Sequence, residues 1–331
     1  MKNSISKFID RLKNFPQNHS GSTNAFVLII AFIVLFLISV TIINHALFTK
    51  EYRLKVEQEI STIAELKSEE IVRWRNERLG NGKVFYKNPV FYSRIKAIVD
   101  NPFNFEKKDS EKKILRAIYD SYGQYFRISI VGISGKELLS TPDESRQNSI
   151  ALIAGIAGAI QTKQIGFMDF FRDDETRIPY IAFIIPIIDE NGNNPLGALI
   201  FSIDPETYLY PSLQKWPTKS DSGESFLIRK DGNDALYLSE LKRQKNSALV
   251  FRKPLTQTDL PSVKAALGEE GLVEGNDYLG NKVVAYVKKI PDSPWFLVVK
   301  INSREIYQRA NERGIIIFLF GLIIFLSGGI G

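Results

Sequence analysis

The 331-residue sequence contains no cysteine and only two histidines. These are His19 and His45, so residues 49–313 contain neither residue type. Without cysteine the chain can form no disulfide and no thiolate metal site. Without histidine, residues 49–313 lack Ser-His-Asp and Cys-His catalytic arrangements and typical zinc sites. A pair of carboxylates is the remaining enzymatic alternative, but no pair stands out, so we expect no catalytic residue, no metal and no cofactor.

A strong basic patch is missing as well. The formal net charge is +6, from 43 basic and 37 acidic residues. The first 24 residues alone supply four of the bases, Lys2, Lys7, Arg11 and Lys13, against a single acid, Asp10. The rest of the chain is nearly balanced, which is typical of a mixed surface and not of a phosphate-binding stripe. We therefore expect no nucleic-acid partner.

Long apolar stretches are present near both ends. Residues 25–48 contain no Asp, Glu, Lys or Arg, and a second apolar stretch covers residues 314–331. A bilayer core needs about 20 apolar helical residues, so both stretches are predicted to be transmembrane helices, the second truncated. Basic residues in residues 1–24 predict a cytoplasmic tail. Residues 49–313 are then extracytoplasmic in a multi-pass protein of the cell membrane. A cleaved signal peptide is the alternative for the first stretch, but the stretch is long for one and no A-x-A site follows.

After the first apolar stretch, the sequence shows the pattern of an amphipathic helix. Apolar residues such as Ile60, Ile63, Ile71 and Trp74 recur near helical spacing, with Glu and Lys between them. This pattern predicts a helix over residues 49–79 that leaves the membrane.

An internal repeat follows this helix. Residues 125–141 and 224–239 both show the pattern of strand, glycine turn and strand, and each is followed by a helical segment and a second hairpin. Gly135 precedes Ile203 by 68 residues, and Gly232 precedes Ile301 by 69. The sequence therefore predicts an α+β fold with two antiparallel-sheet modules on the long helix, divided near residues 211–219. The expected ranges are 80–215 and 216–302 for the modules and 303–313 for a connecting helix with Ser303 as its N-cap.

The order of these elements resembles the double Cache sensor region of prokaryotic transmembrane receptors, whose two modules are PAS-like. The resemblance covers residues 25–331 and is clearest in the stretches ESFLIRKDGNDALYLS and KVVAYVKKIPDSPWFLVVKIN of the second module. It implies a ligand-sensing homodimer in the lipid bilayer. It also implies a cytoplasmic output domain beyond Gly331 that acts on a response regulator. We expect a histidine kinase, with a diguanylate cyclase or a chemoreceptor as alternatives.

Candidate ligand residues come from one strand and from the resemblance. Strand alternation places Tyr125, Arg127 and Ser129 on one face, which in a PAS-like module looks into a cavity. The resemblance implies further ligand contacts in residues 166–180 and after the last strand of the first module. These are Asp169, Arg172, Arg177, Tyr180 and Asp204.

Each candidate has a structural alternative. Arg127 fits an exposed strand position, residues 166–180 fit a solvated loop, and Asp204 fits a helix N-cap. Amino-acid-binding double Cache members share an Arg-x-Trp in this segment. The chain lacks this motif, which argues against an α-amino acid as the ligand. An arginine nonetheless suits a carboxylate. The expected ligand is therefore a small polar or anionic metabolite.

The competing function is a membrane-anchored adhesion or scaffold protein without a small-molecule site. A pocket in the first module that retains a metabolite would favour the sensor, and a closed, dry core there would favour the scaffold. In the second module, Trp295 is expected in the core, and Asp277 and Tyr278 are expected in a turn.

Overall fold

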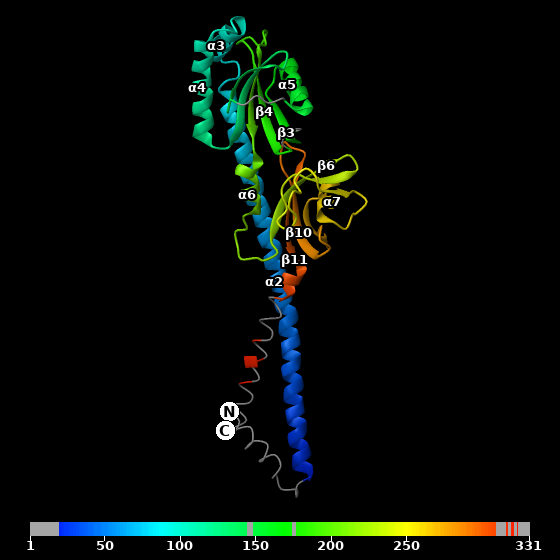
Figure 1. Ribbon diagram of the computed structural model, residues 1–331. Helices are drawn as coiled ribbons and strands as arrows, with labels where there is room; N and C mark the ends of the chain where they lie inside the picture. The colour runs from blue at the N-terminus through cyan, green and yellow to red at the C-terminus, as the bar shows by residue number, and fades with distance from the viewer. Residues whose placement is uncertain are drawn as a thin grey trace. The chain divides into compact units, whose positions relative to one another are not determined.

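The computed structural model describes residues 20–143, 148–173 and 177–308, together with the single positions 316, 319, 320 and 323 (Figure 1). The chain forms two compact units. One consists of residues 57–304 and contains both β-sheets, and the other consists of residues 1–56 and 305–331.

The N-terminal helix is longer than the sequence predicts. Helix α2 runs from Ser20 to Lys83 (Figure 1), whereas the expected extracytoplasmic helix ends at Leu79. Gly80 and Gly82 do not end it. A Cβ atom at Gly82 would lie 2.9 Å from the side chain of Ile185. Glycine therefore lets the last turn of α2 approach the sheet of the first module closely.

The first module is a five-stranded antiparallel sheet in the order β2-β1-β5-β4-β3. Helix α5 packs against one face through the apolar cluster of Leu152, Ile156 and Ala159 with Ile184 and Ile200. Helix α2 approaches the other face at Ile185. The elements are α3 (Pro89–Asp100), α4 (Phe105–Tyr122), β1 (Tyr125–Gly132), β2 (Glu137–Thr141), α5 (Ile150–Thr162), β3 (Gly166–Arg172), β4 (Pro179–Ile187) and β5 (Gly197–Ile203).

The second module repeats this strand order and adds one edge strand. Its six-stranded antiparallel sheet has the order β8-β7-β6-β11-β10-β9. Helix α7 (Pro261–Ala266) packs on one face with Phe226, Tyr237 and Val298 in a shared apolar cluster. The strands are β6 (Glu224–Asp231), β7 (Asp234–Tyr237), β8 (Arg252–Pro254), β9 (Gly271–Asn276), β10 (Lys282–Lys289) and β11 (Trp295–Asn302). The prediction of two antiparallel-sheet modules with a long N-terminal helix is confirmed.

Residues 204–223, which we call the linker, join the two modules. The linker contains the 3-10 helix η1 (Pro205–Thr207) and helix α6 (Leu209–Gln214). After β11, residues 303–308 are helical. Ser303 is thus already inside this helix and is not its N-cap.

Among the described residues, no helix is long and apolar enough to cross a membrane. Most of the expected second span, residues 314–331, and residues 1–19 of the expected tail lie outside the described residues.

Candidate functional site

A small polar cavity lies in the first module between the sheet and α5. Its volume is about 30 Å³, room for one or two water molecules. We call it the first cavity. It is lined by Phe126, Arg127, Ser129, Asn148, Ser149, Leu152, Phe171, Asp173, Tyr180 and Ser202.

Arg127 is the cation of this cavity, and its side chain is held in place by β2. The residue is buried, and Nη2 donates to both carboxylate oxygens of Glu137 at 2.9 Å and to Ser140 Oγ at 3.0 Å. A buried guanidinium needs such partners, because an unpaired buried charge is costly. The fork of donors on Arg127 suits a carboxylate.

The other lining groups add an anion and hydroxyls. Asp173 follows the last residue of β3, and Ser129, Ser149 and Ser202 contribute hydroxyl groups. Ser149 also caps α5, because its Oγ accepts from Leu152 N at 3.2 Å. The first cavity thus offers a guanidinium, a carboxylate and hydroxyls. This set can bind a small molecule that carries both acceptor and donor groups.

Of the eight residues predicted to bind a ligand, the structure brings Arg127, Ser129 and Tyr180 together in the first cavity. It places the other five elsewhere.

Tyr125 lies away from the first cavity because the strand pairing shifts next to it. The register between β1 and β5 breaks between Tyr125 and Arg127, so the expected alternation fails there. The Tyr125 hydroxyl accepts from Asn81 Nδ2 on α2 at 3.0 Å, and burial raises its pKa. Phe126 takes a place in the cavity lining instead.

Asp169 connects the two modules and does not line the cavity. Its Oδ1 accepts from Trp295 Nε1 at 2.5 Å, and its Oδ2 is bonded to the guanidinium of Arg229. The register of β3 against β4 shifts between Met168 and Phe171, and Asp169 lies in this irregular stretch. Trp295 packs against Phe167 and Phe170 of the first module. Trp295 is fully buried, as expected, and its contacts extend beyond the second module to the first.

The three remaining candidates have other environments. Arg172 donates through Nη2 to the backbone oxygen of Ala248 in the second module. Arg177 is exposed, with a φ of 61°. Asp204 caps η1, because its Oδ1 accepts from Glu206 N at 2.8 Å. Burial raises the pKa of Asp204, and the hydrogen bond from Glu206 opposes this shift.

Several lining residues were not predicted from the sequence, including Asn148, Ser149, Phe171, Asp173 and Ser202. Ser202 could have been found by alternation, because it pairs directly with Arg127 between β5 and β1. Asp173 follows the last residue of β3 and is close in sequence to the candidates Asp169, Arg172 and Arg177. Its position in the sequence does not distinguish it from these three residues.

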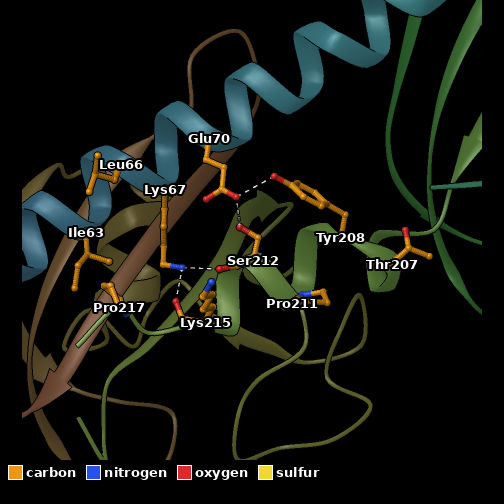
Figure 2. Close-up of a pocket in the computed structure, with 10 residues that line it drawn as sticks. All are labelled: Ile63, Leu66, Lys67, Glu70, Thr207, Tyr208, Pro211, Ser212, Lys215 and Pro217. Atoms are coloured by element: carbon orange, nitrogen blue, oxygen red, sulfur yellow. Dashed lines mark hydrogen bonds between the residues drawn. The ribbon is translucent and has the colours of Figure 1, made fainter. Parts of the chain in front are cut away.

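A second polar cluster lies in a cleft between α2 and the linker. The cleft has a volume of about 450 Å³ and is shown in Figure 2. Lys67 Nζ donates to the backbone oxygens of Ser212 at 2.6 Å, Leu213 at 3.1 Å and Lys215 at 2.9 Å, at the C-terminal end of α6. The negative end of a helix favours such a cation, but burial lowers the pKa of Lys67 to about 8.

One turn further along α2, Glu70 binds the other end of the linker. Its Oε1 accepts from the Tyr208 hydroxyl at 3.0 Å and from Ser212 Oγ at 2.8 Å (Figure 2). Lys67 and Glu70 therefore fix the linker to the long helix.

The second module has a cavity of its own, which is nearly filled. Its volume is about 10 Å³. We call it the second cavity; it is lined by Phe226, Tyr237, Pro261, Ser262, Asn276, Asp277, Tyr278, Val298 and Lys300. Lys300 Nζ lies 2.8 Å from Asp277 Oδ2 and 3.1 Å from Glu224 Oε2. Asp277 and Tyr278 lie in the expected turn, in which Gly280 N donates to the backbone oxygen of Asp277 at 2.9 Å, and they also belong to a buried ionic cluster.

The two cavities use equivalent positions. Arg127 on β1 pairs with Ser202 on β5, and Glu224 on β6 pairs with Lys300 on β11. Asp173 follows β3 and Asp277 follows β9, the edge strands at the same end of the two sheets. Among the described residues, no group of three or more His, Asp or Glu side chains is placed to hold a metal ion.

Comparison with known proteins agrees with this architecture. A family model described as Cache domain, of the double Cache type, matches residues 48–310. No curated protein sequence matches the chain.

Solved structures with a similar fold include ligand-binding domains and one extracellular domain. One is the ligand-binding domain of Mlp24 with asparagine: 14% identity, TM-score 0.54, covering 80% of this chain and 99% of that one. Another is that of the Pseudomonas aeruginosa PAO1 amino acid chemoreceptor PctC with GABA: 16% identity, TM-score 0.53, covering 75% and 100%. A third is the extracellular domain of the putative histidine kinase mmHK1S-Z2: 14% identity, TM-score 0.51, covering 76% and 99%. At such low identity, these similarities show the fold alone.

Proposed function

The chain belongs to the Cache domain family, and from this premise we propose that residues 49–313 are the extracytoplasmic ligand-sensing region of a transmembrane receptor. The apolar stretch of residues 25–48, which lacks any Asp, Glu, Lys or Arg, supports the membrane location. A histidine kinase is the proposed output, supported by the fold shared with the extracellular domain of a putative kinase. The proposed receptor acts as a homodimer, with a response regulator downstream.

The proposed ligand is a small metabolite with a carboxylate and a donor group such as an ammonium or a hydroxyl. The observation that carries this proposal is the polar first cavity, which contains the buried Arg127 and the carboxylate of Asp173. The carboxylate would lie at the guanidinium, and the donor at Asp173. The structures of similar fold that contain asparagine and GABA agree with this chemistry. Because the cavity volume is only about 30 Å³, binding requires the lining side chains to move apart.

Ligand binding can change the output only if the two signalling states differ in affinity. The linker offers a route, because it follows β5 directly and is bound to α2 by Lys67 and Glu70. A ligand that binds Arg127 on β1 or Ser202 on β5 could shift β5. This shift would then displace the linker and change its hydrogen bonds with Lys67 and Glu70.

The test is calorimetric titration of the purified full chain with amino acids, GABA, hydroxy acids and dicarboxylates. In an unfolding experiment, a true ligand at 100-fold excess over its Kd should raise the free energy of unfolding of the chain by about 2.7 kcal/mol. Arg127→Lys keeps the charge but loses the fork, and should weaken binding at least about 10-fold. Asp173→Asn should selectively weaken ligands with an ammonium group.

The matched control is Arg116→Lys, because Arg116 forms an exposed ion pair with Asp120 on α4. If a ligand binds Arg127→Lys and Asp173→Asn as tightly as wild type, the assignment of the first cavity is wrong. If no compound of the panel binds, the scaffold alternative is favoured.

A further inference from the structure

The ionic cluster of the second cavity has the form of an occupied ligand site. Glu224, Asp277 and Lys300 are each at most 5% exposed. Three charged side chains at this depth need a specific arrangement, because burying an unpaired charge is costly.

The ammonium group of Lys300 is surrounded as a bound amine would be. Its Nζ contacts the carboxylates of Asp277 and Glu224 at 2.8 and 3.1 Å. It also lies 5.3 Å from the centre of the Tyr278 ring. Carboxylates together with an aromatic face are the groups that recognise cationic ligands.

The groups around the ammonium are held by contacts that do not involve Lys300. Glu224 Oε1 accepts from Lys242 N and from the Tyr278 hydroxyl, both at 2.8 Å. Asp277 Oδ1 accepts from the backbone N–H groups of Leu279 and Asn281, both at 2.9 Å. The binding groups would therefore stay in place if the lysine were shortened.

The equivalent position of the first module has no such occupant. Ser202 on β5 stands where Lys300 stands on β11, since each pairs with the cavity residue of the first strand of its module. The volume is about 30 Å³ in the first cavity and about 10 Å³ in the second.

We propose that the second cavity is a site for a primary alkylammonium group, occupied in the native chain by the ammonium of Lys300. The second module therefore takes no external ligand, and shortening Lys300 turns it into a receptor for small amines. This inference does not depend on what the first cavity binds.

Thermal unfolding of the full chain tests the proposal. Lys300→Ala removes three methylene groups and the ammonium, which n-propylammonium replaces. At an excess of 100-fold over its Kd, this cation should raise the Tm of the variant by about 5 °C or more. Wild type should not respond, nor should Lys282→Ala, which removes an exposed lysine of β10. Propanol, propionate and tetrapropylammonium should leave the Tm of Lys300→Ala unchanged. Propanol is uncharged, propionate is negatively charged, and tetrapropylammonium is too large for the cavity.

A second variant separates binding from general stabilisation. In Lys300→Ala combined with Glu224→Gln and Asp277→Asn, the cavity keeps its shape but loses its charge, so propylammonium should have no effect. If Lys300→Ala alone does not fold, its folded yield with and without propylammonium becomes the measurement. The proposal is overturned if propylammonium neither stabilises nor rescues Lys300→Ala, or if the neutralised variant or wild type responds equally.

Discussion

The two modules share a strand order but differ in what their cavities contain. In each module the strand that comes first in the chain lies beside the strand that comes last. One pair of opposite residues on these two strands lies at the cavity: Arg127 with Ser202 in the first module, and Glu224 with Lys300 in the second. The second pair is an ion pair, whereas in the first pair a cation faces a hydroxyl and takes its counter-charge from Glu137 on β2. The long side chain of Lys300 accompanies a second cavity of about 10 Å³, and the short Ser202 at the equivalent position accompanies a first cavity of about 30 Å³.

The largest expected effect comes from removing the internal cation of the second module. Lys300→Met leaves Glu224 and Asp277 buried without a counter-charge, so the free energy of unfolding should fall by about 3–5 kcal/mol. Urea unfolding measures this, with the exposed Lys282→Met as the control. A loss below about 1 kcal/mol would show that the cluster contributes little.

The same substitution has a pH dependence with a definite sign. Burial alone would raise the pKa of Asp277, but the hydrogen bond and charge of Lys300, with the backbone N–H groups of Asn281 and Leu279, hold it below its ordinary value. Its stabilisation is therefore present above about pH 4 and is lost as the pH falls through the pKa of the folded state. The difference between wild type and Lys300→Met should shrink in acid.

Giving the first module the lysine of the second should close its cavity. Ser202→Lys places a long side chain and a second cation beside Arg127, and should weaken any ligand found for wild type at least about 100-fold. Ser202→Ala is the matched control and should weaken binding only slightly. Titration calorimetry decides, and unchanged binding in Ser202→Lys would place the ligand outside the first cavity.

The linker between the modules should respond to alkaline pH through Lys67. Folded Lys67 titrates near pH 8, whereas an unfolded lysine keeps its proton until about pH 10.4. Between these values the unfolded chain binds more protons, so stability rises with pH. The free energy of unfolding of wild type should therefore increase relative to Lys67→Met across this range. A constant difference would mean that Lys67 titrates normally.

The smallest effect concerns the exit from the first module. Asp204→Ala removes the cap of η1 and should cost about 1 kcal/mol, while Asp204→Asn keeps an acceptor for Glu206 N and should cost less. Ligand affinity should not change in either variant, because Asp204 is not among the residues that line the first cavity. A large loss of affinity would restore Asp204 as a ligand contact.

The repeat and the alternation of apolar residues were sufficient to predict both sheets, and the helical spacing of apolar residues was sufficient to predict the long helix. Alternation along β1 was sufficient to place Arg127 and Ser129 on one face, because the pairing with β5 is regular from Arg127 onward. The expectation that this face looks into a cavity came from the resemblance. Tyr125 was misplaced because a register shift is a local feature of strand pairing that leaves no mark in the apolar pattern.

The interface between the modules could not be predicted for a different reason. Asp169 and Trp295 are 126 positions apart, and no local rule connects them. Lys300 likewise looks like an ordinary polar residue at the end of a strand, and its role follows only from Glu224 and Asp277, which reach it from two other parts of the chain.

The position of Trp295 between the modules also gives the chain an optical probe. The chain has three tryptophans; Trp74 lies on α2 against Tyr208, and the Trp216 indole donates to Thr218. Replacing these two by phenylalanine would leave the fully buried Trp295 as the sole source of indole fluorescence. Its emission would report directly on the hydrogen bond to Asp169, and thus on whether the modules separate when a ligand arrives.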